Sequence, residues 1–146
     1  MRVSTKTRYG TRLMIELGLR YGEGPVYLKD IARVEEISEK YLSQIIIPLK
    51  NAGLVRSFRG AHGGYVLSRS PGEITLRDIV SVFEGDFELV GCVNKPESCN
   101  RTPVCVTQDL WREMGCRIND LLEEVSLEAL VVRARERQQA TTMYTI

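Results

Sequence analysis

The sequence predicts a mainly α-helical fold with one small β-hairpin, namely a winged helix-turn-helix followed by a long C-terminal dimerisation helix. Two short helical patterns lie close together in the first half, a glycine-rich hairpin follows the second, and a long amphipathic pattern begins near residue 105. We expect a winged helix-turn-helix domain at 1–84, a cysteine-bearing loop at 85–104, the dimerisation helix and a short last helix at 105–137, and a flexible tail at 138–146.

The first two helices are predicted at residues 5–21 and 28–34. Apolar residues recur every four positions in the first, which gives it one buried face. The segment Gly22-Glu23-Gly24-Pro25 ends that helix, because glycine and proline disfavour its continuation.

A third helix is predicted between Ser38, whose hydroxyl can cap its start, and Gly53, which can adopt a positive φ at its end. Its apolar residues fall at positions i, i+3, i+4 and i+7 and form a buried stripe. A helix of this kind after a short connection is typical of the DNA-reading helix of a helix-turn-helix, although many small helical proteins share the pattern. Polar residues near its start are the candidates for contacts with bases or phosphates: Ser38, Lys40, Tyr41, Ser43 and Gln44.

Residues 54–58 and 65–67 alternate like two β-strands, and the glycine-rich segment 59–64 joins them. A hairpin directly after the third helix indicates a wing, with a plain surface hairpin as the alternative. Its glycines permit close approach to a phosphate, and an arginine at its tip can enter a narrow minor groove. The candidate contacts with double-stranded DNA here are Arg56, Arg59, Gly60, His62 and Gly63.

The charge of the chain is divided between its two halves. Residues 1–70 carry 12 Lys and Arg against 6 Asp and Glu, a net charge of +6, whereas residues 71–146 carry 8 against 13, a net charge of −5. A basic half joined to an acidic half favours a polyanion-binding module with a second element attached.

The second half opens with a capping box at 75–78 and a helix that should close the winged domain. Residues 85–103 show neither a helical nor a strand periodicity, which predicts a loop. A helical pattern then runs from about 105 to 124, with an apolar stripe larger than the small domain can cover, so we expect it to pair two chains in a homodimer; packing within one chain is the alternative. Ser126 should cap a last short helix.

Three of the four cysteines, Cys92, Cys99 and Cys105, lie within 14 residues of one another. They lack the close Cys-x2–4-Cys pairs of structural zinc sites. Three thiolates on a loop can hold an iron–sulfur cluster, but redox-active thiols or inert cysteines fit the spacing as well. Cys116 lies about 16 Å along the helix from Cys105, too far to join the other three within one chain, and is expected to be a small buried residue.

The chain resembles the IscR-type iron–sulfur cluster regulators within the Rrf-type winged-helix family. The resemblance covers nearly the whole sequence and is carried by the opening nine residues and by the blocks 37–44, 59–65 and 105–111. It implies a dimeric transcriptional repressor or activator with a [2Fe–2S] cluster on Cys92, Cys99 and Cys105; a [4Fe–4S] cluster or none are the alternatives. Relatives take a fourth ligand from a histidine, where this chain has Gln108.

Other classes of protein fit less well. No apolar stretch approaches the roughly 20 residues that span a bilayer, and the N-terminus lacks a signal-peptide pattern, so we expect a cytoplasmic protein without a membrane partner. A cysteine-dependent enzyme would need a base near a thiol, but the single histidine, His62, is far from every cysteine in the sequence. A regulator without a cluster, which uses its thiols, a metabolite or a partner protein as the signal, is the main alternative.

Overall fold

The structure is a computed structural model that describes residues 2–145; Met1 and Ile146, the outer ends of the expected winged domain and tail, lie outside the described residues. The order of its elements is α1 (Thr5–Leu19), α2 (Leu28–Glu35), α3 (Glu39–Asn51), β1 (Val55–Phe58), β2 (Gly64–Leu67), η1 (Pro71–Glu73), α4 (Leu76–Glu84), α5 (Gly91–Asn94), η2 (Pro96–Ser98), η3 (Thr102–Val104), α6 (Val106–Glu124) and α7 (Leu127–Tyr144).

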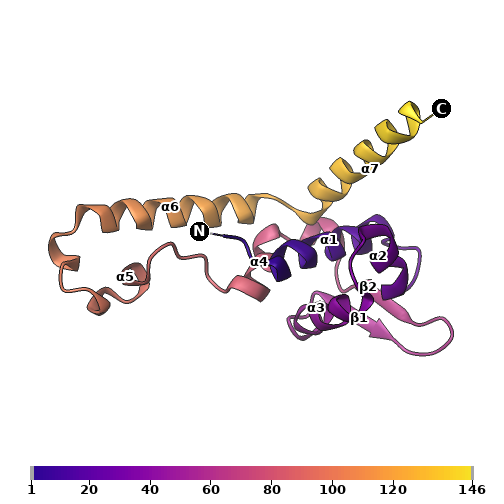
Figure 1. Cartoon of the computed structure of the whole chain (residues 1–146), viewed down its shortest axis with the longest axis horizontal. Helices are drawn as coiled ribbons and strands as arrows, with labels where there is room; N and C mark the ends of the chain where they lie inside the picture. Colours follow the sequence, from indigo (N-terminus) through magenta and orange to yellow (C-terminus); the bar gives the residue numbers. More distant parts are fainter. Residues whose placement is uncertain (1, 146) are drawn as a thin grey trace.

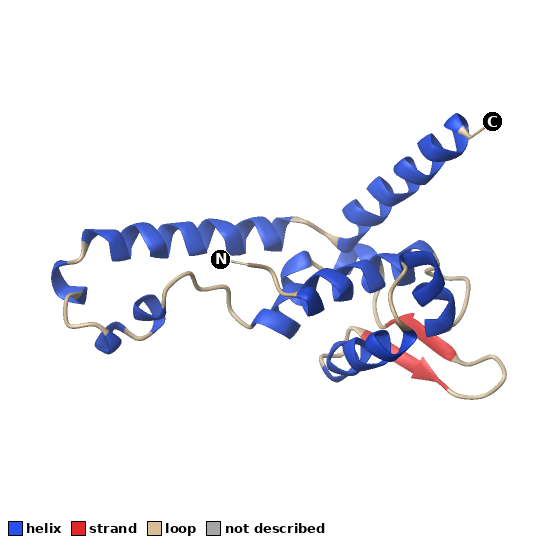
Figure 2. Ribbon diagram, viewed as in Figure 1, coloured by secondary structure: helices blue, strands red, loops and turns tan. Residues whose placement is uncertain are grey.

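The elements form a body with two helical extensions (Figure 1). Helices α1–α4 and the β-hairpin make the body, α6 extends from it as a long arm, and α7 leaves it in another direction. The short helix α5 lies near the far end of the arm. Figure 2 shows the hairpin as the single sheet among the helices of residues 2–145, which confirms the predicted fold class.

The centre of the body is α1, which packs against α3, α4 and α7. Its residues Leu13 and Met14 are fully buried, as the apolar periodicity predicts. Gly10 lets α4 approach closely, because a Cβ there would lie 2.5 Å from the ring of Phe83. Helix α1 therefore packs against helices from both halves of the chain.

The predicted helix caps are present. Ser38 Oγ accepts a hydrogen bond from the Tyr41 N–H at 3.1 Å, and the hydroxyl of Ser126 caps α7 in the same way. Thr75 and Asp78 form a reciprocal capping box at the start of α4. These bonds satisfy backbone N–H groups that a helix start leaves free.

Two parts of the second half differ from the sequence prediction. The last helix continues to Tyr144 where a short helix and a tail were expected, because residues 127–144 contain no glycine or proline and are rich in helix formers. The segment 85–104 contains α5 and two short 3-10 turns, each of only three or four residues, which is too short to show a periodicity in the sequence.

An acidic pair, of which Glu16 is buried and Glu35 partly buried, lies where α1 meets α2 and α7. Glu16 is 5% exposed, and a cavity of about 330 Å³ beside it is also lined by Arg12, Glu35, Arg133 and Arg137. Burial raises the pKa of Glu16 from its ordinary 4.5 to about 7, and the hydrogen bond to Glu35 and the negative charge of Glu35 act in the same direction. Arg12 pairs with Glu35 at 2.6 Å, whereas Glu16 has a more distant cation, Arg20, at 3.8 Å.

Candidate nucleic-acid interface and cysteine loop

Helix α3 presents one polar face to solvent. Its apolar stripe, Leu42, Ile45, Ile46 and Leu49, is buried as predicted. Lys40, Ser43 and Gln44 are therefore exposed together on the opposite side. Tyr41 is different, since it is half-buried and its ring meets that of Tyr9 edge-on at 5.7 Å. The Tyr41 ring thus packs α3 against α1, and part of its side chain remains exposed to solvent.

The hairpin forms a short wing beside α3. Strands β1 and β2 pair antiparallel, with Phe58 opposite Gly64 at the end that leads into the tip. In the tip, Gly60 has a φ of 99°, and the Gly63 N–H donates to the Gly60 carbonyl at 3.0 Å. A Cβ at Gly63 would lie 2.5 Å from the Phe58 carbonyl oxygen, so the tight tip requires glycine there.

An open groove of about 590 Å³ separates α3 from the wing. Four of the predicted DNA contacts line it: Ser43, Arg59, Gly60 and Gly63. The groove also contains Lys29, Lys50 and Glu39, so with Arg59 it has three cations and one anion. A basic groove between a helix and a wing has the charge and shape to receive the phosphate backbone of a duplex.

The lining residues that the sequence did not indicate include one tyrosine and two lysines: Tyr27, Lys29 and Lys50. Lys50 could have been found, because it lies seven residues after Ser43 and so on the same helix face. Tyr27 and Lys29 belong to the start of α2 and reach the groove only through the tertiary fold.

Six of the ten predicted contacts lie outside this groove, namely four at the start of α3 and two in the hairpin: Ser38, Lys40, Tyr41, Gln44, Arg56 and His62. Arg56 lines a separate cavity of about 330 Å³, which it shares with Arg20, the residue that follows α1, and with the turn after it. His62 is exposed in the wing tip. The structure therefore groups Arg59, and not Arg56, with the recognition helix.

The three clustered cysteines occupy different turns of the segment 85–105. Cys92 lies in α5, Cys99 is exposed after η2, and Cys105 is the residue before α6. The Cys105 Sγ lies 3.2 Å from the Thr107 hydroxyl. Hydrogen bonding from that hydroxyl, and secondly from the Gln108 backbone N–H, lowers the pKa of the Cys105 thiol.

Gln108 connects the cysteine segment to α6. It is 4% exposed, and its side-chain Nε2 donates to the Cys92 carbonyl oxygen at 2.7 Å. The amide that occupies the expected fourth-ligand position is thus engaged in holding α5 against the helix.

A cluster fits this segment in donor type but not in arrangement. Three thiolates are suitable ligands for iron. Within residues 2–145, however, no three side chains of His, Cys, Asp or Glu lie together as a metal site would require. For three sulfurs to bind one cluster, the segment would have to change its conformation. Such a change could break the hydrogen bond between Gln108 and Cys92.

Cys116 is exposed on α6, so the expectation of a buried residue was wrong. It lines a cavity of about 250 Å³ together with Trp111 and Phe87. The side of the helix that carries Cys116 is covered only in part by residues 87–94, which leaves the thiol in contact with solvent.

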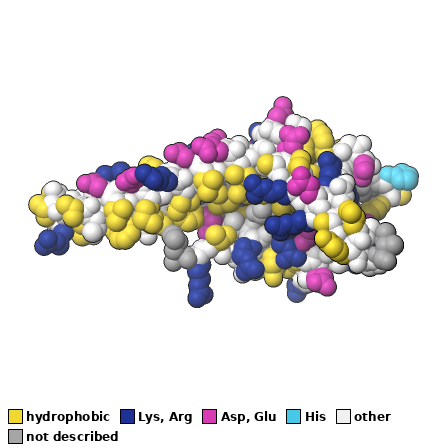
Figure 3. Space-filling view, turned by 90° about the horizontal axis from the view of Figure 1, so that it is seen from above, with side chains coloured by type: hydrophobic (Ala, Val, Ile, Leu, Met, Phe, Trp, Pro, Cys, Tyr) yellow, Lys and Arg dark blue, Asp and Glu magenta, His cyan; other side chains and the backbone are white. Residues whose placement is uncertain are grey.

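The arm formed by α6 has a large uncovered apolar surface. Leu110 and Leu121 are 48% and 60% exposed, and Val106 at the start of the helix is 81% exposed. Figure 3 shows hydrophobic side chains gathered along the length of this arm. The single chain does not bury this surface.

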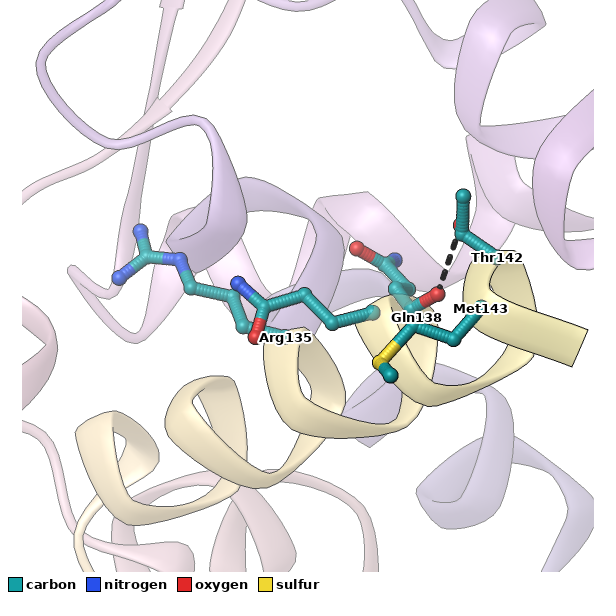
Figure 4. Close-up of a pocket in the computed structure, with 5 residues that line it drawn as sticks. Arg135, Gln138, Thr142 and Met143 are labelled. Carbon is teal, nitrogen blue, oxygen red and sulfur yellow. Dashed lines mark hydrogen bonds between the residues drawn. The ribbon is translucent and has the colours of Figure 1, made fainter.

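A further hollow, of about 410 Å³, lies on α7 (Figure 4). All of its lining residues come from this one helix, including Arg135 and Gln138, whose carbonyl accepts a hydrogen bond from Thr142 at 2.9 Å. It is therefore a depression on one exposed helix and not a cleft between elements.

The chain is similar to known transcriptional regulators over almost its full length. The profile of the Rrf2 family, described as an iron-dependent transcriptional regulator, matches residues 3–133. The HTH-type transcriptional regulator CymR of Bacillus subtilis is 42% identical over 144 residues, which is 99% of each protein. The HTH-type transcriptional regulator IscR of Pectobacterium atrosepticum is 35% identical and covers 99% of this chain and 91% of its own length.

Solved structures of CymR and IscR superpose on most of the chain. The structure of CymR, the global cysteine regulator of B. subtilis, superposes with a TM-score of 0.79 at 41% identity and covers 91% of this chain and 98% of its own. The structure of T. potens IscR superposes with a TM-score of 0.77 at 38% identity and covers 94% and 91%. Among the helices of residues 2–145, none has the length and apolar character needed to cross a bilayer. The chain belongs to the Rrf2 family of winged-helix DNA-binding transcriptional regulators.

Proposed function

We propose that the chain acts in the cytoplasm as a homodimeric regulator that binds a specific double-stranded DNA operator through α3 and the wing. The observation that carries this proposal is the basic groove between the exposed face of α3 and Arg59. In a dimer, two α3 helices would enter successive major grooves, about 34 Å apart, while each Arg59 enters the neighbouring minor groove.

The test is the Arg59→Ala variant, measured on a duplex that the unmodified protein selects from a random pool. Operator binding should weaken by roughly 1–3 kcal/mol. Arg69→Ala is the matched control, because Arg69 is an arginine of the same body that pairs with Asp78 and does not line the groove. Equal affinities of the two variants at moderate salt would contradict the wing assignment.

The proposed dimer is formed by the uncovered apolar face of α6. Sedimentation should show a dimer for the unmodified chain and a monomer for Leu121→Glu, because a carboxylate would be buried without a partner. Val132→Glu alters an exposed apolar residue of α7 and should remain dimeric. A Leu121→Glu protein that stays dimeric would refute this interface.

The cysteine segment receives the signal that controls DNA binding. Two mechanisms of sensing are considered, one with an iron–sulfur cluster and one without. In the first, Cys92, Cys99 and Cys105 hold an iron–sulfur cluster, [2Fe–2S] or [4Fe–4S], with Gln108 in the place of a fourth ligand. Such a cluster would supply a redox-sensitive and oxygen-sensitive group. The similarity to IscR and the stabilised thiolate of Cys105 support this form.

In the second form the protein carries no cluster, and its thiols, a metabolite or a partner protein provide the signal. The separated sulfurs, the bound Gln108 amide and the similarity to the cysteine regulator CymR support it. Iron and sulfide analysis of anaerobically prepared protein separates the two. Visible charge-transfer absorption that Cys92→Ser abolishes and Cys116→Ser retains supports the cluster, whereas a colourless protein with four titratable thiols excludes it.

A further inference from the structure

The wing is tied to the body at its base by a short additional β-bridge. The Val26 N–H donates to the Tyr65 carbonyl, and the Tyr65 N–H donates to the Val26 carbonyl, both at 2.9 Å. Gly64 makes this approach possible, since a Cβ there would lie 2.6–2.9 Å from the backbone of Val26. The chain before α2 thus pairs with β2 and fixes the base of the wing.

Tyr27, the next residue, reaches the tip of the wing. Its hydroxyl donates to the Ala61 carbonyl oxygen at 2.5 Å, across 34 residues of sequence. Its ring is 38% exposed in the groove, and the Lys29 ammonium lies 5.2 Å from the ring centroid. Ala61 is two residues from Arg59, so this bond acts on the part of the wing that carries the arginine.

The tip has little other support. A two-stranded hairpin is marginally stable by itself, and here the strands are four residues each, with Ala61 and His62 exposed. A tip that moved freely would have to be ordered each time DNA binds, which lowers affinity. The hydrogen bond from Tyr27, at the start of α2, orders the tip before DNA binds and so removes part of this entropic cost.

We propose that Tyr27 is a positioning residue that latches the wing tip and so presents Arg59 to the minor groove at a fixed distance from α3. The proposal rests on the proposed function and adds to it the side chain that sets the geometry of the wing. Tyr27 acts through Ala61 and Arg59; its hydroxyl is occupied by the Ala61 carbonyl and does not serve as a contact with phosphate.

The first test measures the free protein, so that it does not depend on DNA. Tyr27→Phe retains the ring and its packing with Lys29 and removes only the donor. Amide hydrogen exchange should become faster at residues 60–63, including the Gly63 N–H, and stay unchanged in α1 and α3. Tyr21→Phe is the control, because Tyr21 is likewise exposed but lies outside the groove between α3 and the wing. Unchanged exchange in the tip of Tyr27→Phe overturns the latch.

The second test is a double-mutant cycle on the selected duplex. Tyr27→Phe should weaken binding about 3- to 10-fold, the usual effect of one neutral hydrogen bond. In the Arg59→Ala background the same change should have almost no further effect, since the tip then carries no arginine to position. Fully additive losses would show that Tyr27 acts independently of Arg59 and would overturn the proposal. If the unmodified chain bound no duplex, the proposed function would fail while the exchange experiment still reported on the latch.

Discussion

Replacing Glu16 by glutamine should stabilise the protein at alkaline pH and leave it almost unchanged in acid. Glutamine has the size of glutamate and can donate to Glu35 as a protonated Glu16 does, but it never acquires a charge in this buried position.

The magnitude follows from the pKa of Glu16, which is raised from 4.5 to about 7 in the folded protein. The folded state binds the proton more tightly than the unfolded state, so the stabilisation is complete below pH 4.5 and is lost as the pH rises towards 7. At 1.36 kcal/mol per pKa unit, the unmodified protein should lose about 2–3 kcal/mol relative to Glu16→Gln between pH 5 and pH 8.

The assay is urea unfolding of both proteins at fixed protein concentration across this pH range. The comparison must be between variants, because other groups titrate as well; hydrogen bonds from Ser4 and Thr7, for example, lower the pKa of Glu84 and so act in the opposite direction. Glu23→Gln, at an exposed position, should give a curve parallel to that of the unmodified protein. Parallel curves for Glu16→Gln would refute the raised pKa of the buried Glu16.

Three further outcomes are expected. Alkylation at pH 7 should modify Cys105 faster than the other thiols, and Thr107→Val should slow it, because the Thr107 hydroxyl lowers the Cys105 pKa; equal rates in the variant would contradict this. Thr75→Ala should cost about 1 kcal/mol in the free energy of unfolding by removing a helix cap, measured by denaturant titration. Gly10→Ala should cost about 1–3 kcal/mol in the same assay, because the new methyl group overlaps the Phe83 ring; an unchanged midpoint would show that the ring moves freely.

The fold of the first half could be predicted from the sequence because its local and tertiary preferences agree. The stripe on α3, the Ser38 cap and the glycine-rich tip each specify one local structure, and the packed domain uses all of them. The end of α7 could not be predicted, since almost every side chain after Val131 is exposed and leaves no apolar periodicity.

The candidate site was predictable where it depends on a local sequence pattern and not where it depends on packing between segments. Ser43 and Arg59 were found from their local patterns and do line one groove. The separation of Arg56 from that groove depends on the tertiary packing of β2 against α1, which forms the cavity that Arg56 lines. Tyr27 reaches the wing tip only because a β-bridge brings the start of α2 beside β2, and no local pattern indicates such a bridge.

The position of the cysteines limits how any signal at them can control DNA binding. Cys105 precedes α6, a helix of 19 residues that is about 28 Å long and that reaches α4 of the body at its other end, where Arg77 pairs with Glu123. The cysteine segment lies towards the far end of the arm from α3 and the wing (Figure 1). A change at the thiols therefore cannot act by touching the recognition helix of its own chain. Since α6 also carries the uncovered apolar face, in the proposed dimer such a change would act through the way the two arms pair, and so through the spacing of the two α3 helices.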